Sequence, residues 1–102
     1  MYVKIYSYRL KPNREEEYRD IQLRAEKIYS SFSDKQTLYL ESKTDSLQRL
    51  EIHIYKNENS YSDAIQEIDT QQEIQLLYKS FLEVISSIEE LTEEDYNQII
   101  FK

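Results

Sequence analysis

A stretch in the middle of the chain alternates strictly between apolar and polar side chains, and it constrains the fold more than any other feature. From Leu47 to Tyr55 the sequence reads LQRLEIHIY. Period-two alternation is typical of a strand whose two faces meet different surroundings. One face carries Leu50, Ile52 and Ile54, and the other carries Arg49, Glu51, His53 and Tyr55. Because the second face mixes an aromatic ring, both charges and the only histidine, we expect it to contact a ligand or another chain.

The composition limits the number of domains and the classes of partner. The chain has 102 residues, so we assign residues 1–102 to a single domain. A net charge of -7 opposes nucleic acid or an anionic membrane as the partner, since both attract positive surfaces. The absence of cysteine and of any long apolar run favours a cytoplasmic protein with no signal peptide and no transmembrane span.

The remaining segments predict an alternation of strands and helices. Asn13 with Glu16 three residues later has the form of a helix N-cap, and apolar residues then recur every three or four positions. The predicted elements are a strand over Tyr2–Leu10, a helix from Asn13 to Phe32, a strand over Thr37–Lys43, the strand that ends at Tyr55, two helical segments that meet near Asp69, and a last strand over Asn97–Lys102.

The pairing of the two central strands can be predicted from their faces. Residues opposite each other in a sheet must point the same way. A three-residue loop centred on Asp45 sets Leu40 against Leu50 and Glu41 against Arg49, which matches apolar with apolar and acid with base. A two-residue loop would oppose residues of unlike faces, so we predict the register centred on Asp45.

This order of elements predicts an α+β, ferredoxin-like split βαβ fold with a four-stranded antiparallel sheet. Both crossovers lie on one side of such a sheet and leave its other face open. We expect the helices to cover the aliphatic face, which consists of Val3, Ile5, Leu38, Leu40, Leu50, Ile52 and Ile54. The open face would then be the tyrosine face, which consists of Tyr2, Lys4, Tyr6, Tyr8, Tyr39, Glu41, Arg49, Glu51, His53 and Tyr55.

Three local patterns accompany this order: the first strand running into Leu10-Lys11-Pro12-Asn13 before an acidic helix start, the hairpin from Leu38 to Tyr55, and the helix after Tyr55-Lys56-Asn57-Glu58. With them, nearly the whole chain resembles the antibiotic-biosynthesis-monooxygenase-like family of dimeric α/β barrels. The resemblance implies a homodimer whose sheets pack through their open faces around a pocket. It also implies oxygenation of a small aromatic or quinol substrate without a cofactor.

The chain departs from the family at particular positions. Tyr55 stands where the family commonly has tryptophan, and Asn13 and Ser33-Asp34 stand where it often has glycine. The haem-degrading branch uses a tryptophan and a helical histidine, whereas this chain has no tryptophan and carries its histidine on a strand. Haem degradation is therefore not carried over from the resemblance.

The tyrosine face supplies the candidate site. His53 is the candidate catalytic base, because an imidazole can accept a proton from a phenol or hydroquinone near neutral pH. Arg49 is the candidate group to hold an anionic intermediate. The candidate ligand-binding residues are Tyr6, Tyr39, Arg49, Glu51 and Tyr55.

Two other interpretations of the same residues remain open. Glu41, Glu51 and His53 could coordinate a metal, but they fit a charge network with Arg49 and Lys4 equally well, and we expect no metal and no cofactor. The tyrosines could serve packing alone, because tyrosine suits subunit interfaces. The alternative function is therefore a non-catalytic homodimer that binds a small ligand or interacts through this face.

Overall fold

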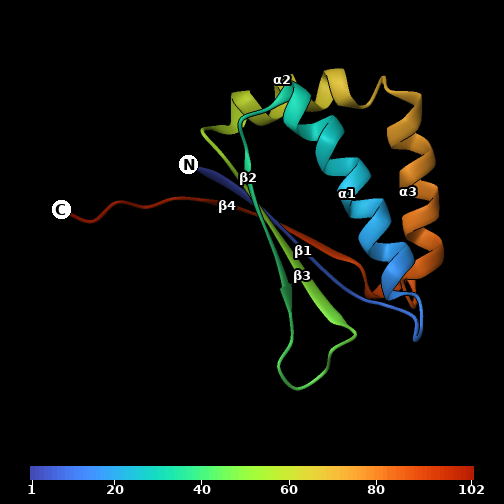
Figure 1. Cartoon of the computed structure of the whole chain (residues 1–102). Coiled ribbons are helices and arrows are strands. Elements are labelled where there is room, and N and C mark those ends of the chain that lie inside the picture. The colour runs from blue at the N-terminus through green and yellow to red at the C-terminus, as the bar shows by residue number, and fades with distance from the viewer.

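The computed structural model describes the whole chain, residues 1–102, as one layer of strands and one layer of helices (Figure 1). The element order confirms the predicted alternation of strands and helices. The elements are β1 (Tyr2–Arg9), α1 (Glu15–Phe32), β2 (Gln36–Glu41), β3 (Gln48–Tyr55), α2 (Glu58–Ile68), α3 (Gln72–Val84), the short 3-10 helix η1 (Ile88–Glu90) and β4 (Thr92–Asn97). None of the helices combines the length and the apolar character needed to cross a membrane.

The four strands form one antiparallel sheet in the order β2-β3-β1-β4, which confirms the ferredoxin-like fold. The predicted register between β2 and β3 is also confirmed, since Leu40 lies opposite Leu50 and Glu41 lies opposite Arg49. Side chains of unlike polarity would face each other after a slip of one residue. The edge strand β2 and its neighbour β3 are therefore held in register by both of their faces.

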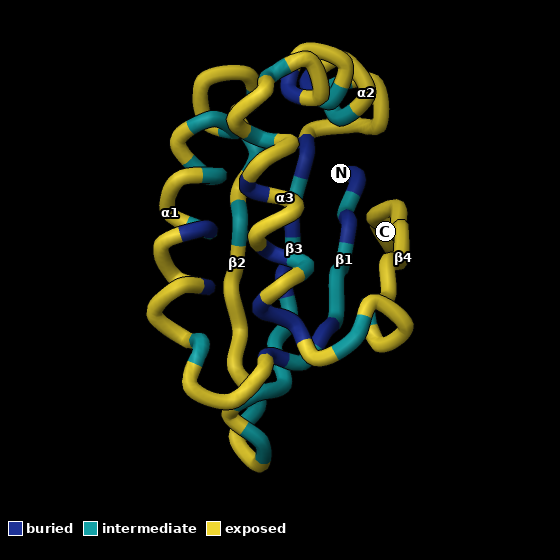
Figure 2. The backbone as a smooth tube through the Cα atoms, turned by 90° about the vertical axis from the view of Figure 1, so that its right-hand side faces the viewer, coloured by how far each residue is buried: buried dark blue, intermediate teal, exposed yellow.

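The helices cover the opposite face from the one that we predicted. α1, α2 and α3 all lie on one side of the sheet (Figure 1), and the residues buried beneath them include Tyr8, Glu51 and His53 of the tyrosine face. On the aliphatic face, Leu38 and Leu40 stay 42% and 44% exposed. Figure 2 shows buried and intermediate positions along the inner strands β1 and β3, whereas the edge strands β2 and β4 are mostly exposed. The aliphatic face is the open one.

The tyrosine face can be buried because its rings pack on the helices and its polar atoms have partners. The Tyr8 ring meets the Phe81 ring of α3 edge-on, with centroids 4.9 Å apart. Lys4 pairs with Glu93 and Asp95 on the neighbouring strand. Buried polar groups are tolerated when they are hydrogen-bonded, and no buried side-chain polar atom here lacks a partner. Alternation defines two faces but does not decide which one the helices take.

Two predictions about the chain are wrong: the residue that caps α1 and the position of the last strand. Asn13 does not cap α1: its backbone adopts the left-handed conformation with φ of 65°, and Arg14 occupies the cap position without a side-chain hydrogen bond. Asparagine tolerates this conformation better than most residues. In a chain without glycine, Asn13 therefore supplies the sharp turn between β1 and α1.

The last strand also lies earlier than predicted, at Thr92–Asn97 instead of Asn97–Lys102. Its acidic sequence resembles a turn, yet Glu93 and Asp95 both pair with Lys4 of β1. The strand lies at the sheet edge, where charged side chains reach water. After β4 the chain runs away from the domain (Figure 1), and Ile99, Ile100 and Phe101 are exposed.

Candidate functional site

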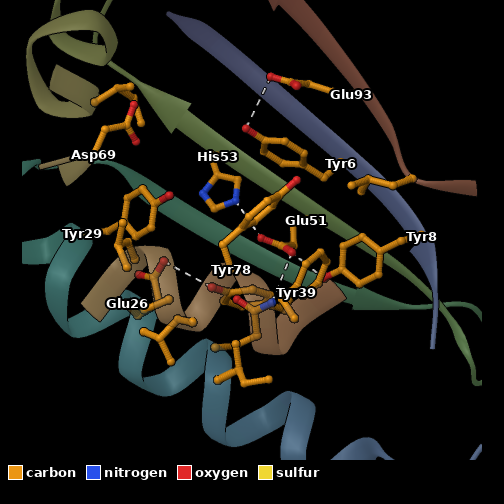
Figure 3. Close-up of a pocket in the computed structure, with 18 of the residues that line it drawn as sticks. Tyr6, Tyr8, Glu26, Tyr29, Tyr39, Glu51, His53, Asp69, Tyr78 and Glu93 are labelled. Carbon is orange, nitrogen blue, oxygen red and sulfur yellow. Dashed lines mark hydrogen bonds and ion pairs between the residues drawn. The ribbon is translucent and has the colours of Figure 1, made fainter. Parts of the chain in front are cut away.

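A cavity of about 440 Å³ lies between the tyrosine face and the helices (Figure 3). Its volume falls within the range of roughly 300–1,000 Å³ that is usual for small-molecule sites. Side chains from the sheet, from α1 and from α3 contribute to its wall. The aromatic residues of the wall are Tyr6, Tyr8, Tyr29, Tyr39, Tyr55, Tyr78 and Phe81. The cavity therefore lies within one chain, beneath the helices, and not between the open faces of two sheets as predicted.

A buried pair formed by Glu51 and His53 lies on the sheet side of this cavity. The two residues are two positions apart on β3, so both point toward the helices. Glu51 Oε1 and His53 Nε2 are 2.9 Å apart, and the residues are only 8% and 7% exposed. Tyr8 donates a hydrogen bond to Glu51 Oε2, and Gln22 of α1 donates another over 3.3 Å. The carboxylate is thus fixed from the sheet and from a helix.

These contacts assign the hydrogen positions on His53. An ionised carboxylate can only accept hydrogen bonds, so the imidazole donates to it through the hydrogen on Nε2. In the neutral ring Nδ1 is then the acceptor and carries the basic lone pair. Its nearest hydrogen-bond partner is Thr37 Oγ1 on β2, at 3.4 Å. That distance is long for a hydrogen bond, which leaves Nδ1 able to accept from a hydroxyl in the cavity.

A second polar cluster lies behind His53, formed by Glu26, Lys35, Thr37 and Tyr39. Lys35 Nζ donates to Glu26 Oε1 over 2.6 Å and also contacts Thr37 Oγ1, and its side chain is 1% exposed. Thr37 and Tyr39 each donate to the same Glu26 oxygen over 3.2 Å. Burial raises the pKa of Glu26, but these hydrogen bonds outweigh it and leave the pKa below its usual value. Glu26 is therefore held as a carboxylate.

The tyrosines of the wall serve as hydrogen-bond donors and aromatic surface and not as bases. Burial raises the pKa of Tyr29 to about 12, and the negative charges of Glu51 and Asp69 add to this. The pKa values of Tyr6 and Tyr39 are also raised, first by burial and then by Glu93 and Glu51, respectively. All of these phenols keep their protons near neutral pH. His53 is consequently the only ordinary base on the wall apart from the carboxylates.

The wall of the cavity is electrostatically negative. The charged residues that line it are Glu26, Glu51, Asp69 and Glu93, and no lysine or arginine lines it. Lys35 and Lys4 neutralise Glu26 and Glu93 through ion pairs. Asp69 makes no ion pair and no side-chain hydrogen bond, and it projects toward the cavity near Tyr29 (Figure 3). The site therefore favours a neutral ligand over an anion.

Most of the residues chosen from the sequence come together at this cavity. Tyr6, Tyr39, Glu51, His53 and Tyr55 all line it. The structure places the sixth, Arg49, elsewhere. Its guanidinium pairs with Glu41 over 3.0 Å, donates to the Ser46 carbonyl and lies over the Tyr18 ring.

Sequence reasoning missed the contributions of α1 and of the segment before β2. Glu26 and Tyr29 lie one turn apart on the helix, beside the apolar stripe that marked it as amphipathic. Lys35 precedes β2 in a polar stretch that resembles a loop. A cluster of a buried lysine, a carboxylate and a hydroxyl is assembled only in three dimensions, and no spacing in the sequence signals it.

No family model and no curated protein matches the sequence. Solved structures do match the fold. A protein named "Putative antibiotic biosynthesis monooxygenase" from Nitrosomonas europaea superposes with a TM-score of 0.76 at 12% identity, covering 98% of this chain and 100% of its own. SnoaB, a cofactor-independent oxygenase from Streptomyces nogalater, superposes with a TM-score of 0.76 at 5% identity, covering 98% of this chain and 94% of its own.

A further similar structure is an uncharacterized NIPSNAP domain protein from Burkholderia xenovorans, with a TM-score of 0.76, 10% identity and coverage of 100% of this chain and 98% of that one. At such identities the likeness establishes the fold. The chain has the fold of the antibiotic biosynthesis monooxygenases, as the resemblance in its sequence predicted, and shares this fold with the NIPSNAP domain protein.

The buried tyrosines predict a loss of stability at alkaline pH. Unfolded tyrosine ionises near pH 10.0, whereas burial raises the pKa of Tyr18 and Tyr29 to about 12 in the folded chain. Between these values the unfolded state binds fewer protons, so the free energy of unfolding falls as pH rises. We expect the urea midpoint to drop across this window, and to drop less in Tyr18→Phe. Equal slopes for the two proteins would contradict the assignment for Tyr18.

Proposed function

We propose that this protein binds a small, uncharged, electron-rich aromatic molecule, such as a hydroquinone, and promotes its oxygenation without a cofactor. The observation that carries the proposal is the position of His53, a base fixed by Glu51 on the wall of an aromatic cavity. The fold shared with SnoaB, itself a cofactor-independent oxygenase, supports the reaction class by analogy.

The cavity wall supports this class of ligand. Tyrosine rings pack against aromatic ligands in offset or edge-on arrangements and present hydroxyl groups at the same time. The volume of about 440 Å³ suits a molecule of one or a few rings. The carboxylates of the wall would repel a ligand that carries its own carboxylate. A neutral quinol is therefore a better fit than an aromatic acid.

The chemical step that these residues can perform is removal of a proton. A ligand hydroxyl that reaches His53 Nδ1 transfers its proton to that nitrogen, while the Nε2 hydrogen stays bonded to Glu51. The imidazolium lies between the Glu51 carboxylate and the new phenolate, so the charge that forms is balanced locally. The deprotonated ring gives up electrons to oxygen more readily than the phenol does; O2 is the oxidant, and one of its atoms enters the ring to give a hydroxyquinone while the other takes two hydrogens and leaves as water. Glu51 acts by fixing the ring and its tautomer.

Oxygen uptake with methylhydroquinone tests the proposed reaction. We expect uptake above the spontaneous rate, and a loss of about a hundred-fold or more in kcat/KM for His53→Gln, because general base catalysis contributes about this much. Glu51→Gln should also slow the reaction, since an amide does not stabilise the imidazolium. Glu41→Gln is the matched control, because Glu41 lies at the far end of β2, paired with Arg49.

Two results would contradict the oxygenase proposal: no uptake above the spontaneous rate, or uptake that His53→Gln leaves unchanged. Saturable binding of methylhydroquinone without uptake would favour the alternative, a non-catalytic protein that binds small ligands. Tyr78 and Asp69 on the wall are both exposed, so water reaches the cavity, and this favours that alternative.

We further propose that the protein is a homodimer formed through the aliphatic face. The residues of this face lie on the side of the sheet that no helix covers. A twofold axis brings the same apolar surface of a second copy onto it, and a patch of this kind is seldom left in water. The seven aliphatic residues carry no charge, and the charged strand residues on their side of the sheet are Arg9 and Glu94, one of each sign, whereas the rest of a chain with net charge -7 would repel its copy.

A charge placed at the centre of the aliphatic face tests the dimer. Ile52 lies on β3 between Leu38 on one side and Ile5 on the other. We expect light scattering to give twice the chain mass for the natural protein and the single chain mass for Ile52→Glu, because a buried unpaired charge is strongly unfavourable. Leu23→Glu, on the solvent side of α1, should stay dimeric. A monomeric natural protein, or a dimeric Ile52→Glu, would overturn the proposal.

A further inference from the structure

The proposed reaction moves a ligand proton onto His53, and the base works again only after that proton has passed to the reduced oxygen or to solvent. Transfer of the Nε2 proton to Glu51 would leave the remaining hydrogen on Nδ1, which could then accept no proton from the next ligand, and Glu51 is only 8% exposed. We propose that Thr37 and Glu26 form a proton exit that connects His53 Nδ1 with solvent. The inference rests on the proposed function of the same cavity, and it names two residues that act through His53: Thr37, which does not line the cavity, and Glu26, which does.

The contacts of Thr37 fit this role. Its Oγ1 lies 3.4 Å from His53 Nδ1 and 3.2 Å from Glu26 Oε1, and it also contacts Lys35 Nζ. A hydroxyl accepts two hydrogen bonds and donates one. When His53 is protonated, the Thr37 hydroxyl accepts hydrogen bonds from Nδ1 and from Lys35 and donates one to Glu26. Both of its acceptor sites and its one donor site are then filled. The contact with Nδ1 becomes charge-assisted in that state and therefore stronger.

The transfer balances as two coupled proton movements. The hydrogen on Nδ1 leaves that nitrogen and forms a covalent bond to Thr37 Oγ1. At the same time the original hydroxyl hydrogen of Thr37 moves to Glu26 Oε1. No electrons leave or enter the protein. Glu26 then releases the proton to water, because its side chain is 33% exposed and its hydrogen-bond donors lower its pKa. His53 returns to the neutral form with the basic lone pair on Nδ1.

Two other hydrogen bonds lead away from Glu51: the one to the Gln22 amide cannot carry a proton onward, and the one to Tyr8 does not reach solvent. Glu51 Oε2 accepts from Tyr8, and the Tyr8 hydroxyl lies 2.6 Å from the Tyr18 hydroxyl. Both tyrosines are buried, at 0% and 6% exposure. Burial raises the pKa of Tyr18 to about 12, so its proton is not readily released. This branch holds Glu51 in place, and the branch through Thr37 is the one that ends at the surface.

The same geometry could be compared with a carboxylate, imidazole and hydroxyl arranged as a nucleophilic triad. In that case the Thr37 hydroxyl would attack a substrate. Thr37 does not line the cavity, however, and its oxygen is enclosed by His53, Glu26 and Lys35. A ligand in the cavity has no access to it, so the hydroxyl can pass a proton but cannot form a covalent intermediate.

The deciding experiment measures how fast the Nδ1 hydrogen of protonated His53 exchanges with water. The chain has a single histidine, so nitrogen-edited NMR of the ring needs no assignment. We expect exchange in Thr37→Val, which keeps the side-chain shape without the hydroxyl, to be about ten-fold slower than in the natural protein. Thr37→Ser should restore it. Glu26→Gln should also slow exchange, because an amide cannot carry the proton, whereas Glu67→Gln on the solvent side of α2 should not.

Exchange in Thr37→Val that is as fast as in the natural protein would overturn the proton exit, whatever the protein does to a quinol. Slow exchange in both Thr37→Val and Thr37→Ser would overturn it too, because the hydroxyl would then not be the group that matters. Circular dichroism and the urea midpoint of each variant show whether it is folded. If Thr37→Val does not fold, the exchange rates of Glu26→Gln and Glu67→Gln decide: the exit predicts slower exchange only in Glu26→Gln.

Steady-state kinetics separate this inference from the proposed function. If the protein oxidises methylhydroquinone, Thr37→Val should lower kcat about ten-fold with an unchanged KM, and Thr37→Ser should recover kcat. If no oxygen is consumed by the natural protein but Thr37→Val still slows ring exchange, the oxygenase proposal fails while the proton path stands. If kcat falls for His53→Gln but not for Thr37→Val, the proton leaves by another way and the exit is wrong.

Discussion

The hydrogen bond between Glu51 and His53 is the interaction on which the candidate site depends. It lies on a face of β3 that the helices bury, where an unpaired carboxylate would cost several kcal/mol. Each neighbouring element contributes to satisfying the pair: Tyr8 from β1, Gln22 from α1 and Thr37 from β2. The base, the aromatic wall and the path to Glu26 therefore belong to one connected polar network inside an otherwise apolar layer.

Burial of the tyrosine face explains the rest of the architecture. Tyrosine rings and paired charges line the space under α1 and α3, and a cavity of about 440 Å³ lies there. The aliphatic face, which could have formed a conventional core with the helices, is left on the outside of the sheet. One sheet thus has a face that lines a cavity within the chain and an aliphatic face that forms the interface of the proposed dimer.

The sequence predicted the elements and their pairing because these depend on local periodicity and on matched side chains, as for Leu40 and Leu50. It also identified Glu51 and His53 through their alternation on β3. It did not predict which face the helices cover, since both faces alternate equally well and the choice depends on packing against α1 and α3. Lys35 and Glu26 were missed for a related reason: their meeting with Thr37 is a tertiary contact. The acidic β4 was missed because its ion pairs with Lys4 come from another strand.

The central claim is that the cavity beside His53 is a site for a neutral aromatic ligand. The most direct measurement is an NMR titration of the His53 ring with methylhydroquinone and, in parallel, with gentisate, a hydroquinone that carries a carboxylate. The account predicts saturable shifts of the ring resonances with methylhydroquinone and binding of gentisate that is at least about ten-fold weaker, because the wall of the cavity is negative. Ring resonances that neither compound shifts, or equal affinity for the two, would contradict it.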